Sequence, residues 1–172
     1  MARAVIMGVA GSGKSSVGLQ LATRVGAIYL DGDDLHPASN VAKMSAGIPL
    51  TDADRTPWLI RIGETLHAAR GPILIGCSAL KRPYRDLIRQ GAGGPVVFVH
   101  LVGSRSLIES RMSARQGHFM PTSLLDSQFA DLQPLEPDEA GFETDIGQPL
   151  PSVIDEAETK LTAMQDWDAP LP

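Results

Sequence analysis

Residues 8–18 read GVAGSGKSSVG, and no other stretch restricts the possible folds so strongly. Four of them fit the pattern G-x-x-x-x-G-K-[ST]: Gly8, Gly13, Lys14 and Ser15. The pattern needs a strand before its loop and a helix after it. The preceding run AVIMGV is apolar and predicts a buried strand, and the following KSSVGLQLATRVG has apolar residues at helical spacing. The required context is therefore present.

A loop of this kind binds the phosphates of a nucleotide. Its glycines let backbone N–H groups converge on phosphate oxygens, and the helix N-terminus adds a partial positive charge. Lys14 can bridge the β- and γ-phosphates, and the Ser15 hydroxyl can ligate Mg²⁺. The alternative is a glycine-rich turn without a function, which the flanking strand and helix disfavour. The predicted nucleotide contacts are Gly8, Gly11, Ser12, Gly13, Lys14, Ser15 and Ser16.

Apolar segments alternate with segments of helical periodicity along the rest of the chain. Strands are predicted at 4–9, 27–34, 72–80, 95–103 and 142–146. Helices are predicted at 14–26, 56–70, 82–90, 106–115, 121–132 and 152–164. Because several strands are apolar throughout, we expect an α/β fold whose central parallel sheet is covered on both faces. Pro57 is expected in the first turn of its helix, residues 40–59 in a long polar loop, and the tail from Asp166 to fray.

Composition limits the functional class. The 172 residues suit one domain, and 43% hydrophobic residues are enough for one core. The net charge of -5 argues against a nucleic-acid partner. Cys77 is the single cysteine, so no internal disulfide can form, and we expect it to be a small buried residue in a reducing compartment. No apolar run approaches the roughly 20 residues of a membrane span, so we expect a cytoplasmic protein without a membrane partner.

Acidic residues stand where the second strand ends. Asp31 and Asp33 are two apart, so in an extended segment both could face one crevice beyond the carboxyl ends of the strands. A carboxylate there could accept a proton from an attacking hydroxyl or hold Mg²⁺. The alternative is that Asp33 or Asp34 only caps the next helix. Cys77 stands where a Walker-B aspartate would follow the third strand, which makes Asp31 the better candidate for the metal.

Two arginines lead into a segment that contains Gly117. Arg111 and Arg115 are four residues apart and share one helical face, which suits a lid that closes over phosphates and neutralises their charge. The alternative is a solvated face with carboxylate pairs along the helix. His118 follows in the same segment, and a lone histidine of this kind is more often a surface residue than a functional one.

Other cations are weaker candidates. Arg55 lies in the long polar segment, and a salt bridge with the acids at 52 and 54 is the alternative to a ligand contact. Lys81 and Arg85 follow the third strand at the expected ligand edge and are again four residues apart.

Taken together, the motifs resemble those of gluconate kinases of the small P-loop type. The resemblance covers nearly the whole chain up to about residue 150. It is carried by GVAGSGKSSVG, LDGDDLHP, NVAKMSAGIPLTDADRTPWL, CSALKRPYRDLIR and RQGHFMPTSLLDSQFADLQPLEPDE, of which the last is the most diagnostic. Gln133 stands where such sequences are expected to have an acidic residue. Shikimate kinase and the nucleoside monophosphate kinases are more distantly similar.

The resemblance implies one three-layer domain of the P-loop NTPase type, similar to the nucleoside monophosphate kinases, over residues 1–172. A substrate-binding segment would span about 34–60 and a lid about 112–135. The implied reaction is the ATP-dependent phosphorylation of D-gluconate at its 6-hydroxyl, with Mg²⁺ as cofactor. A homodimer is also implied.

The resemblance also assigns roles to individual residues. Asp31 would act on the metal side together with Ser15, and Asp33 on the acceptor hydroxyl. Arg55 would hold the substrate carboxylate, since arginine can bind one with two parallel hydrogen bonds. Further substrate contacts would come from Lys81, Arg85 and His118. The lid arginines near ATP would be Arg111 and Arg115, with Lys14 supplying charge to the transferring group.

Other functions are less consistent with the residues. Without the resemblance, a gluconate kinase, a shikimate kinase and a nucleotide kinase could not be separated, because each needs an anion pocket beside the phosphate loop. A GTPase switch should carry N-K-x-D, which is absent from the sequence. A motor or assembly ATPase would more often carry an acid at the Walker-B position. A nucleic-acid-dependent ATPase is disfavoured by the net charge.

Overall fold

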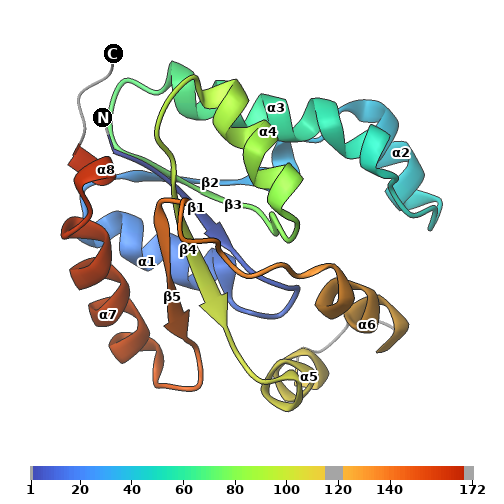
Figure 1. The fold of residues 1–172 in the computed structure, drawn as a ribbon. Coiled ribbons are helices and arrows are strands. Elements are labelled where there is room, and N and C mark those ends of the chain that lie inside the picture. Colours follow the sequence, from blue (N-terminus) through green and yellow to red (C-terminus); the bar gives the residue numbers. More distant parts are fainter. Residues whose placement is uncertain (1, 115–121, 169–172) are drawn as a thin grey trace.

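The described residues of the computed structural model, 2–114 and 122–168, form an α/β fold with one five-stranded sheet (Figure 1). All four neighbouring strand pairs are parallel, and the strand order is β2-β3-β1-β4-β5. The strands are β1 (Arg3–Met7), β2 (Ile28–Asp31), β3 (Ile73–Gly76), β4 (Val97–Val102) and β5 (Gly141–Asp145). The predicted parallel sheet is confirmed; β1 to β4 are shorter than their predicted segments, and β5 begins and ends one residue before the predicted 142–146.

Helices cover both faces of the sheet. They are α1 (Lys14–Arg24), α2 (Ala38–Ser45), α3 (Asp52–Ala68), α4 (Arg82–Ala92), α5 (Arg105–Ser113), α6 (Thr122–Asp131), α7 (Leu150–Thr162) and α8 (Gln165–Asp168), with a 3₁₀ turn η1 (Gly32–Leu35). Figure 1 shows α3 and α4 on one face, α1 and α7 on the other, and α5 and α6 beyond one end of the strands. Among the described residues, no helix is both long and apolar enough to cross a membrane.

The core is divided by the sheet because successive strand residues point to opposite faces. Ala4 and Ile6 of β1 pack in the cluster that includes α1 and α7, whereas Val5 and Met7 pack in the cluster that includes α3 and α4. The second cluster also needs a close helix approach. A Cβ at Gly63 of α3 would lie 2.2 Å from the Ile88 carbonyl oxygen of α4, so only glycine fits there.

The region from 40 to 59 differs from the expected long loop. Helix α2 occupies its beginning, and α3 starts at Asp52, before the predicted start. Thr51 and Asp54 form a reciprocal capping box, which satisfies N–H groups at the start of the helix and places Pro57 inside it rather than in its first turn. The tail also differs: α8 includes Trp167, which is buried against α7 and its neighbours, so burial replaces the predicted fraying there.

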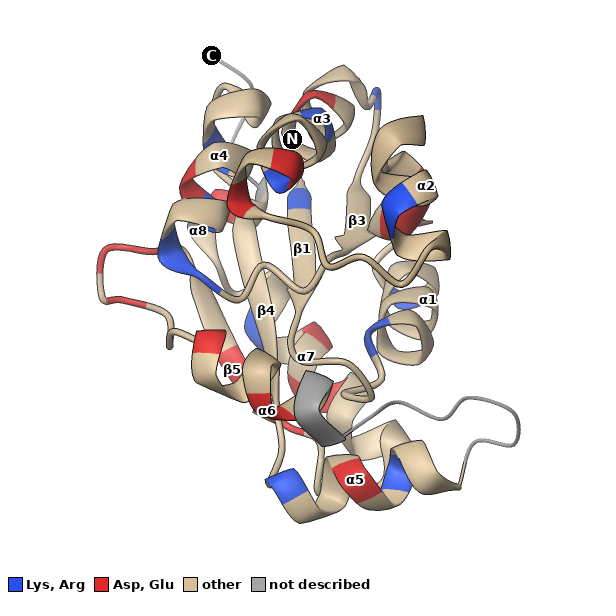
Figure 2. Ribbon diagram, turned by 90° about the vertical axis from the view of Figure 1, so that its right-hand side faces the viewer, with Lys and Arg blue, Asp and Glu red and all other residues tan. Residues whose placement is uncertain are grey.

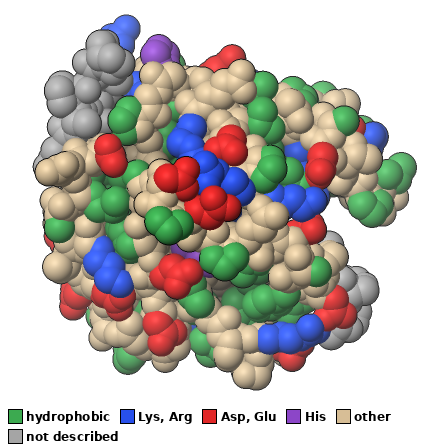
Figure 3. All heavy atoms as spheres, viewed as in Figure 1, with side chains coloured by type: hydrophobic (Ala, Val, Ile, Leu, Met, Phe, Trp, Pro, Cys, Tyr) green, Lys and Arg blue, Asp and Glu red, His purple; other side chains and the backbone are tan. Residues whose placement is uncertain are grey.

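Strand register brings the predicted ligand-binding segments to one edge. The glycine-rich loop follows β1, and Asp31, the last residue of β2, lies beside Gly76, the last residue of β3. Figure 3 shows the surface hollowed on the side where α2 and α6 face each other. Acidic and basic segments are interspersed over the helices in the view of Figure 2.

Candidate active site

The glycine-rich loop has the backbone of a phosphate-binding loop. Gly11 and Gly13 have φ values of 78° and 92°, a region that favours glycine, and Gly13 directly precedes α1. The Lys14 ammonium lies across the loop and donates to the carbonyl oxygens of Gly8 (3.1 Å) and Val9 (3.2 Å). The loop therefore directs a helix N-terminus and a lysine at one site, an arrangement that suits a nucleotide phosphate.

A cavity of about 360 Å³ adjoins this loop and has the size of a small-molecule site. It is lined by loop residues, by Arg111 of α5 and by residues that follow β5, including Ile146, Gln148 and Val153. Arg111 donates to the Ile146 carbonyl oxygen at 2.6 Å, which holds its side chain against the cavity. The sequence predicted Arg111 near the nucleotide, but it gave no signal for the segment after β5.

Ser15 and Asp31 are brought together as predicted. The Ser15 hydroxyl donates to Asp31 Oδ2 at 3.3 Å, and Asp31 Oδ1 accepts from the Asp33 backbone N–H at 3.1 Å. Asp31, and not Asp33 or Asp34, is thus the residue that caps η1. A hydroxyl and a carboxylate beside a phosphate loop fit Mg²⁺, which takes oxygen ligands from one or two protein groups and from phosphates.

The Asp33 carboxylate is open to an incoming substrate, because its side chain is 83% exposed. Desolvation by surrounding atoms and the negative charge of Asp31 raise the pKa of Asp33 above its ordinary value. Lys14 and His36 act in the opposite direction. A carboxylate with a raised pKa is the better proton acceptor, so this side chain suits the role of a base.

His36 lies beside Asp33, and it was not singled out from the sequence although it belongs to the LDGDDLHP motif. Its ring stacks on Trp58 of α3 with centroids 4.0 Å apart, and its Nε2 is 3.9 Å from Asp33 Oδ1. Its Nδ1 is 3.2 Å from the amide nitrogen of Asn40 in α2. Burial lowers the pKa of His36, so the neutral ring is favoured.

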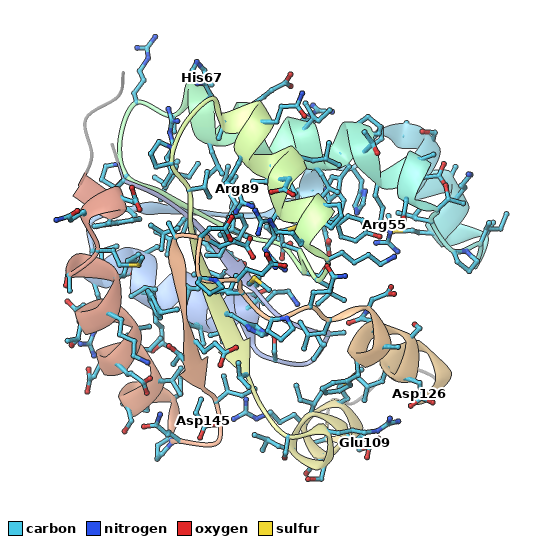
Figure 4. All side chains as sticks on the ribbon, in the orientation of Figure 1. Arg55, His67, Arg89, Glu109, Asp126 and Asp145 are labelled. Carbon is cyan, nitrogen blue, oxygen red and sulfur yellow. The ribbon has the colours of Figure 1, made fainter. Side chains whose placement is uncertain are left out.

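Arg55 lies on α3 at the same cleft. Figure 4 shows it projecting from α3 toward the side on which α6 lies. The salt bridges suggested as an alternative are not formed in the described part of the chain, because Asp54 pairs with Lys43 at 2.7 Å and Asp52 accepts from the Tyr84 hydroxyl at 2.5 Å. The guanidinium instead lies 5.9 Å from the centre of the Tyr84 ring. Arg55 can therefore receive an anionic ligand without breaking an ion pair.

Lys81 is next to the same tyrosine. Its ammonium lies 5.4 Å from the centre of the Tyr84 ring and 3.5 and 3.6 Å from carboxylate oxygens of Asp52 and Asp131. It is partly exposed and lies between α3 and α6, a position that is compatible with the predicted substrate contact.

The predicted role of Arg85 as a substrate contact is wrong. Its side chain is fully buried and forms two hydrogen bonds of 2.7 Å with the buried carboxylate of Glu139. Its other hydrogen bonds are donated to the carbonyl oxygens of Ala79, Leu80, Gln133 and Pro134. A guanidinium with these partners fixes the loop before β5 to α4 and has no face toward the cleft. Figure 3 shows the charged side chains that gather around this loop and α4.

The remaining predictions have mixed outcomes. Arg115 and His118 lie outside the described residues. On α5 the carboxylate pairing proposed as an alternative occurs at Arg105 and Glu109, not at Arg111.

Helix α6 contributes Gln128, whose side-chain oxygen accepts from the Ala10 N–H of the phosphate loop at 2.6 Å. Cys77 is buried as expected, and burial raises the pKa of its thiol to about 12.

Known proteins are similar to this chain in sequence and in fold. A family model described as an AAA domain matches residues 4–135. Thermoresistant gluconokinase of Escherichia coli K12 is 46% identical over 154 residues, which make up 87% of this chain and 87% of that protein. A gluconokinase structure from Sinorhizobium meliloti 1021 aligns with a TM-score of 0.85 and 49% identity over 94% of this chain and 91% of that one.

A more remote match is the shikimate kinase of Aquifex aeolicus. It aligns with a TM-score of 0.60 and 16% identity over 94% of this chain and 96% of that one. An identity this low shows a shared fold alone, which agrees with the distant similarity expected from the motifs.

Proposed function

The chain belongs to the gluconokinase family, and from this premise we propose that it transfers the γ-phosphoryl group of ATP to the 6-hydroxyl of D-gluconate. The products are ADP and 6-phospho-D-gluconate. The observation that carries the kinase chemistry is the contact of Ser15 with Asp31 at the phosphate loop, directly beside the open carboxylate of Asp33. The choice of acceptor is supported by relatives named gluconokinase that are 46% and 49% identical.

On the nucleotide side, the loop N–H groups and Lys14 would bind the β- and γ-phosphates. Mg²⁺ would be held by Ser15 and Asp31 and would neutralise charge on the phosphate oxygens. Arg111 lines the adjoining cavity, which is large enough for part of a nucleotide. We assign to Arg111 and Arg115 the stabilisation of negative charge during transfer, because Arg111 directly precedes the proposed lid of about 112–135 and Arg115 falls within it.

On the acceptor side, Arg55 would bind the carboxylate of gluconate, supported by its position at the cleft with no carboxylate partner among the described residues. Lys81 and His118 would contact the hydroxyl groups. Asp33 would orient the 6-hydroxyl and take its proton as the new oxygen–phosphorus bond forms. Of these residues, Arg55 lies in the substrate-binding segment that we propose at about 34–60, within one domain of residues 1–172.

The test is the release of ADP from Mg·ATP in parallel reactions with D-gluconate, shikimate, nucleoside monophosphates, glucose or no acceptor. Turnover only with D-gluconate is the expected result. Turnover with another acceptor would support a kinase activity but contradict D-gluconate as the substrate. Steady hydrolysis without an acceptor would instead favour an ATPase.

We further propose a homodimer that forms in the cytoplasm, where ATP is available. The edge strand β2 exposes Ile28 (57%) and Leu30 (37%), and Arg61 and Glu64 line the same groove. Two copies related by a two-fold axis could cover these apolar side chains and pair each Arg61 with the other copy's Glu64. Sedimentation equilibrium should give twice the chain mass, and Ile28→Lys should give the monomer. A monomeric wild-type protein would contradict the dimer.

A further inference from the structure

His36 is held in one orientation by two described neighbours, Trp58 and Asn40. Its ring stacks on Trp58 at an angle of 16°, and the Trp58 indole N–H is itself fixed by the Gly32 carbonyl oxygen at 2.8 Å. Asn40, which is 2% exposed, holds the other side of the ring through its amide. The His36 side chain is only 4% exposed, whereas the neighbouring Asp33 side chain is open. The imidazole is therefore part of the wall behind the Asp33 carboxylate.

The partners of the ring determine which nitrogen carries the proton. The Asn40 amide nitrogen can only donate, and it is 3.2 Å from Nδ1 of His36 and 2.9 Å from the Asp54 carbonyl oxygen. Its two hydrogens thus serve these two acceptors, so Nδ1 accepts and the proton of the neutral ring is on Nε2. Nε2 is the nitrogen that faces Asp33.

The gap between His36 and Asp33 fits one oxygen atom. The separation of 3.9 Å from Nε2 to Oδ1 is too long for a direct hydrogen bond. This separation is shorter than the length of two hydrogen bonds in a straight line, about 5.6 Å. An oxygen atom to one side of the line from Nε2 to Oδ1 can therefore form a hydrogen bond with each of them. That oxygen must accept from the imidazole N–H and donate to the carboxylate. A hydroxyl group does both.

We propose that His36 is a substrate-binding residue whose Nε2–H donates to the reacting hydroxyl of the acceptor while Asp33 accepts the proton of that hydroxyl. The assignment rests on the proposed function. The hydroxyl oxygen forms a bond to the γ-phosphorus as the bond from phosphorus to the β,γ-bridging oxygen breaks. ADP leaves with the electron pair, the proton goes to Asp33, and His36 keeps its own proton throughout.

Two substitutions at the same position test the donor. His36→Phe keeps a ring against Trp58 but removes the N–H, so kcat/KM for D-gluconate should fall about tenfold with the KM for ATP nearly unchanged. His36→Gln carries an amide N–H near the position of Nε2 and should recover a large part of the loss. His67→Phe, at the far end of α3 in Figure 4, is the matched control and should leave both constants unchanged.

The inhibition constant of 6-deoxy-D-gluconate, which lacks the reacting hydroxyl, separates a direct contact from a structural effect. His36→Phe should leave this constant nearly unchanged, because the contact that it removes is not made by the analogue. An equal loss of affinity for analogue and substrate would overturn the proposal, as would an unchanged kcat/KM for D-gluconate. If His36→Phe does not fold, His36→Leu replaces it with the same expectations. A wild-type protein inactive on D-gluconate would instead refute the proposed function.

Discussion

Lys14 carries the positive charge that lies closest to the phosphate loop carbonyls. Its contacts with Gly8 and Val9 are to neutral carbonyl oxygens, which a nucleotide phosphate can replace. Lys14→Ala should therefore reduce turnover with ATP and D-gluconate by at least about 100-fold, because a preorganised charge is lost from the transition state. Lys160→Ala, which removes a surface lysine on α7, is the control and should leave turnover unchanged.

Asp33 gives a prediction on the pH dependence of catalysis. Desolvation and the Asp31 charge raise the pKa of Asp33, so the wild-type kcat/KM should fall with decreasing pH already above the ordinary range of an aspartate. Asp33→Asn should lower turnover by about 100-fold or more, remove this acidic limb and leave ATP binding nearly intact, as measured by calorimetry. Asp34→Asn is the neighbouring control, and an Asp33→Asn enzyme with normal activity would contradict the assignment.

At the residue scale, the sequence predicts the positions of site residues that are fixed by a short motif or by the end of a strand. Ser15 belongs to a motif of fixed geometry, and Asp31 ends a strand that parallel pairing brings to the same edge. The burial of the Arg85 side chain depends on its contact with Glu139, which is 54 residues away in the sequence. No local pattern could therefore show that the guanidinium would be buried. The same limit applies to His36, because its ring is positioned by stacking on Trp58 of α3.

At the scale of elements, the Arg85–Glu139 pair joins α4 to the loop that leads into β5. Desolvation opposes ionisation of Glu139, but hydrogen bonds from Arg85, the Glu136 N–H and Arg89 outweigh it and lower its pKa to about 2. The contribution to stability is thus complete above the unfolded pKa of about 4.5 and is lost as the pH falls toward 2. A shift of this size corresponds to about 3 kcal/mol.

Glu139→Gln should lower the free energy of unfolding in urea at pH 7 by about 3 kcal/mol, because a buried guanidinium loses its counter-ion. The variant should also lose less stability than the wild type between pH 4.5 and 2. Glu136→Gln removes an exposed partner of Arg82 in the same loop and should cost at most about 1 kcal/mol. Equal effects of the two substitutions would show that burial of the pair does not matter.

Helix boundaries depended on capping more than on apolar spacing. The inner strands β1, β3 and β4 were predictable because they are buried on both faces and read as continuous apolar runs. The start of α3 was missed because Pro57 resembles a helix start, although Thr51 and Asp54 already form a capping box. Helix α2 was missed because Val41 and Met44 are exposed, so the segment has little buried face to produce a periodic pattern.

At the scale of the whole molecule, both ligands should stabilise the same fold. The loop that would bind ATP follows the central strand β1, whose residues pack in the core clusters on both faces of the sheet. The proposed gluconate site is formed by η1, α3 and the segment after β3. Binding at either site therefore adds to the free energy of unfolding of the domain as a unit.

Mg·ATP at about 100 times its dissociation constant should raise the unfolding free energy by about 2.7 kcal/mol and the midpoint of thermal unfolding by roughly 5–10 °C. D-gluconate alone should give a smaller rise that disappears in Arg55→Ala, because that variant lacks the group assigned to the carboxylate. Glucose, which has no carboxylate, is the ligand control and should give no shift. Equal shifts with glucose and D-gluconate would show that Arg55 does not select an acid, and the acceptor site would then have to be sought elsewhere in the cleft.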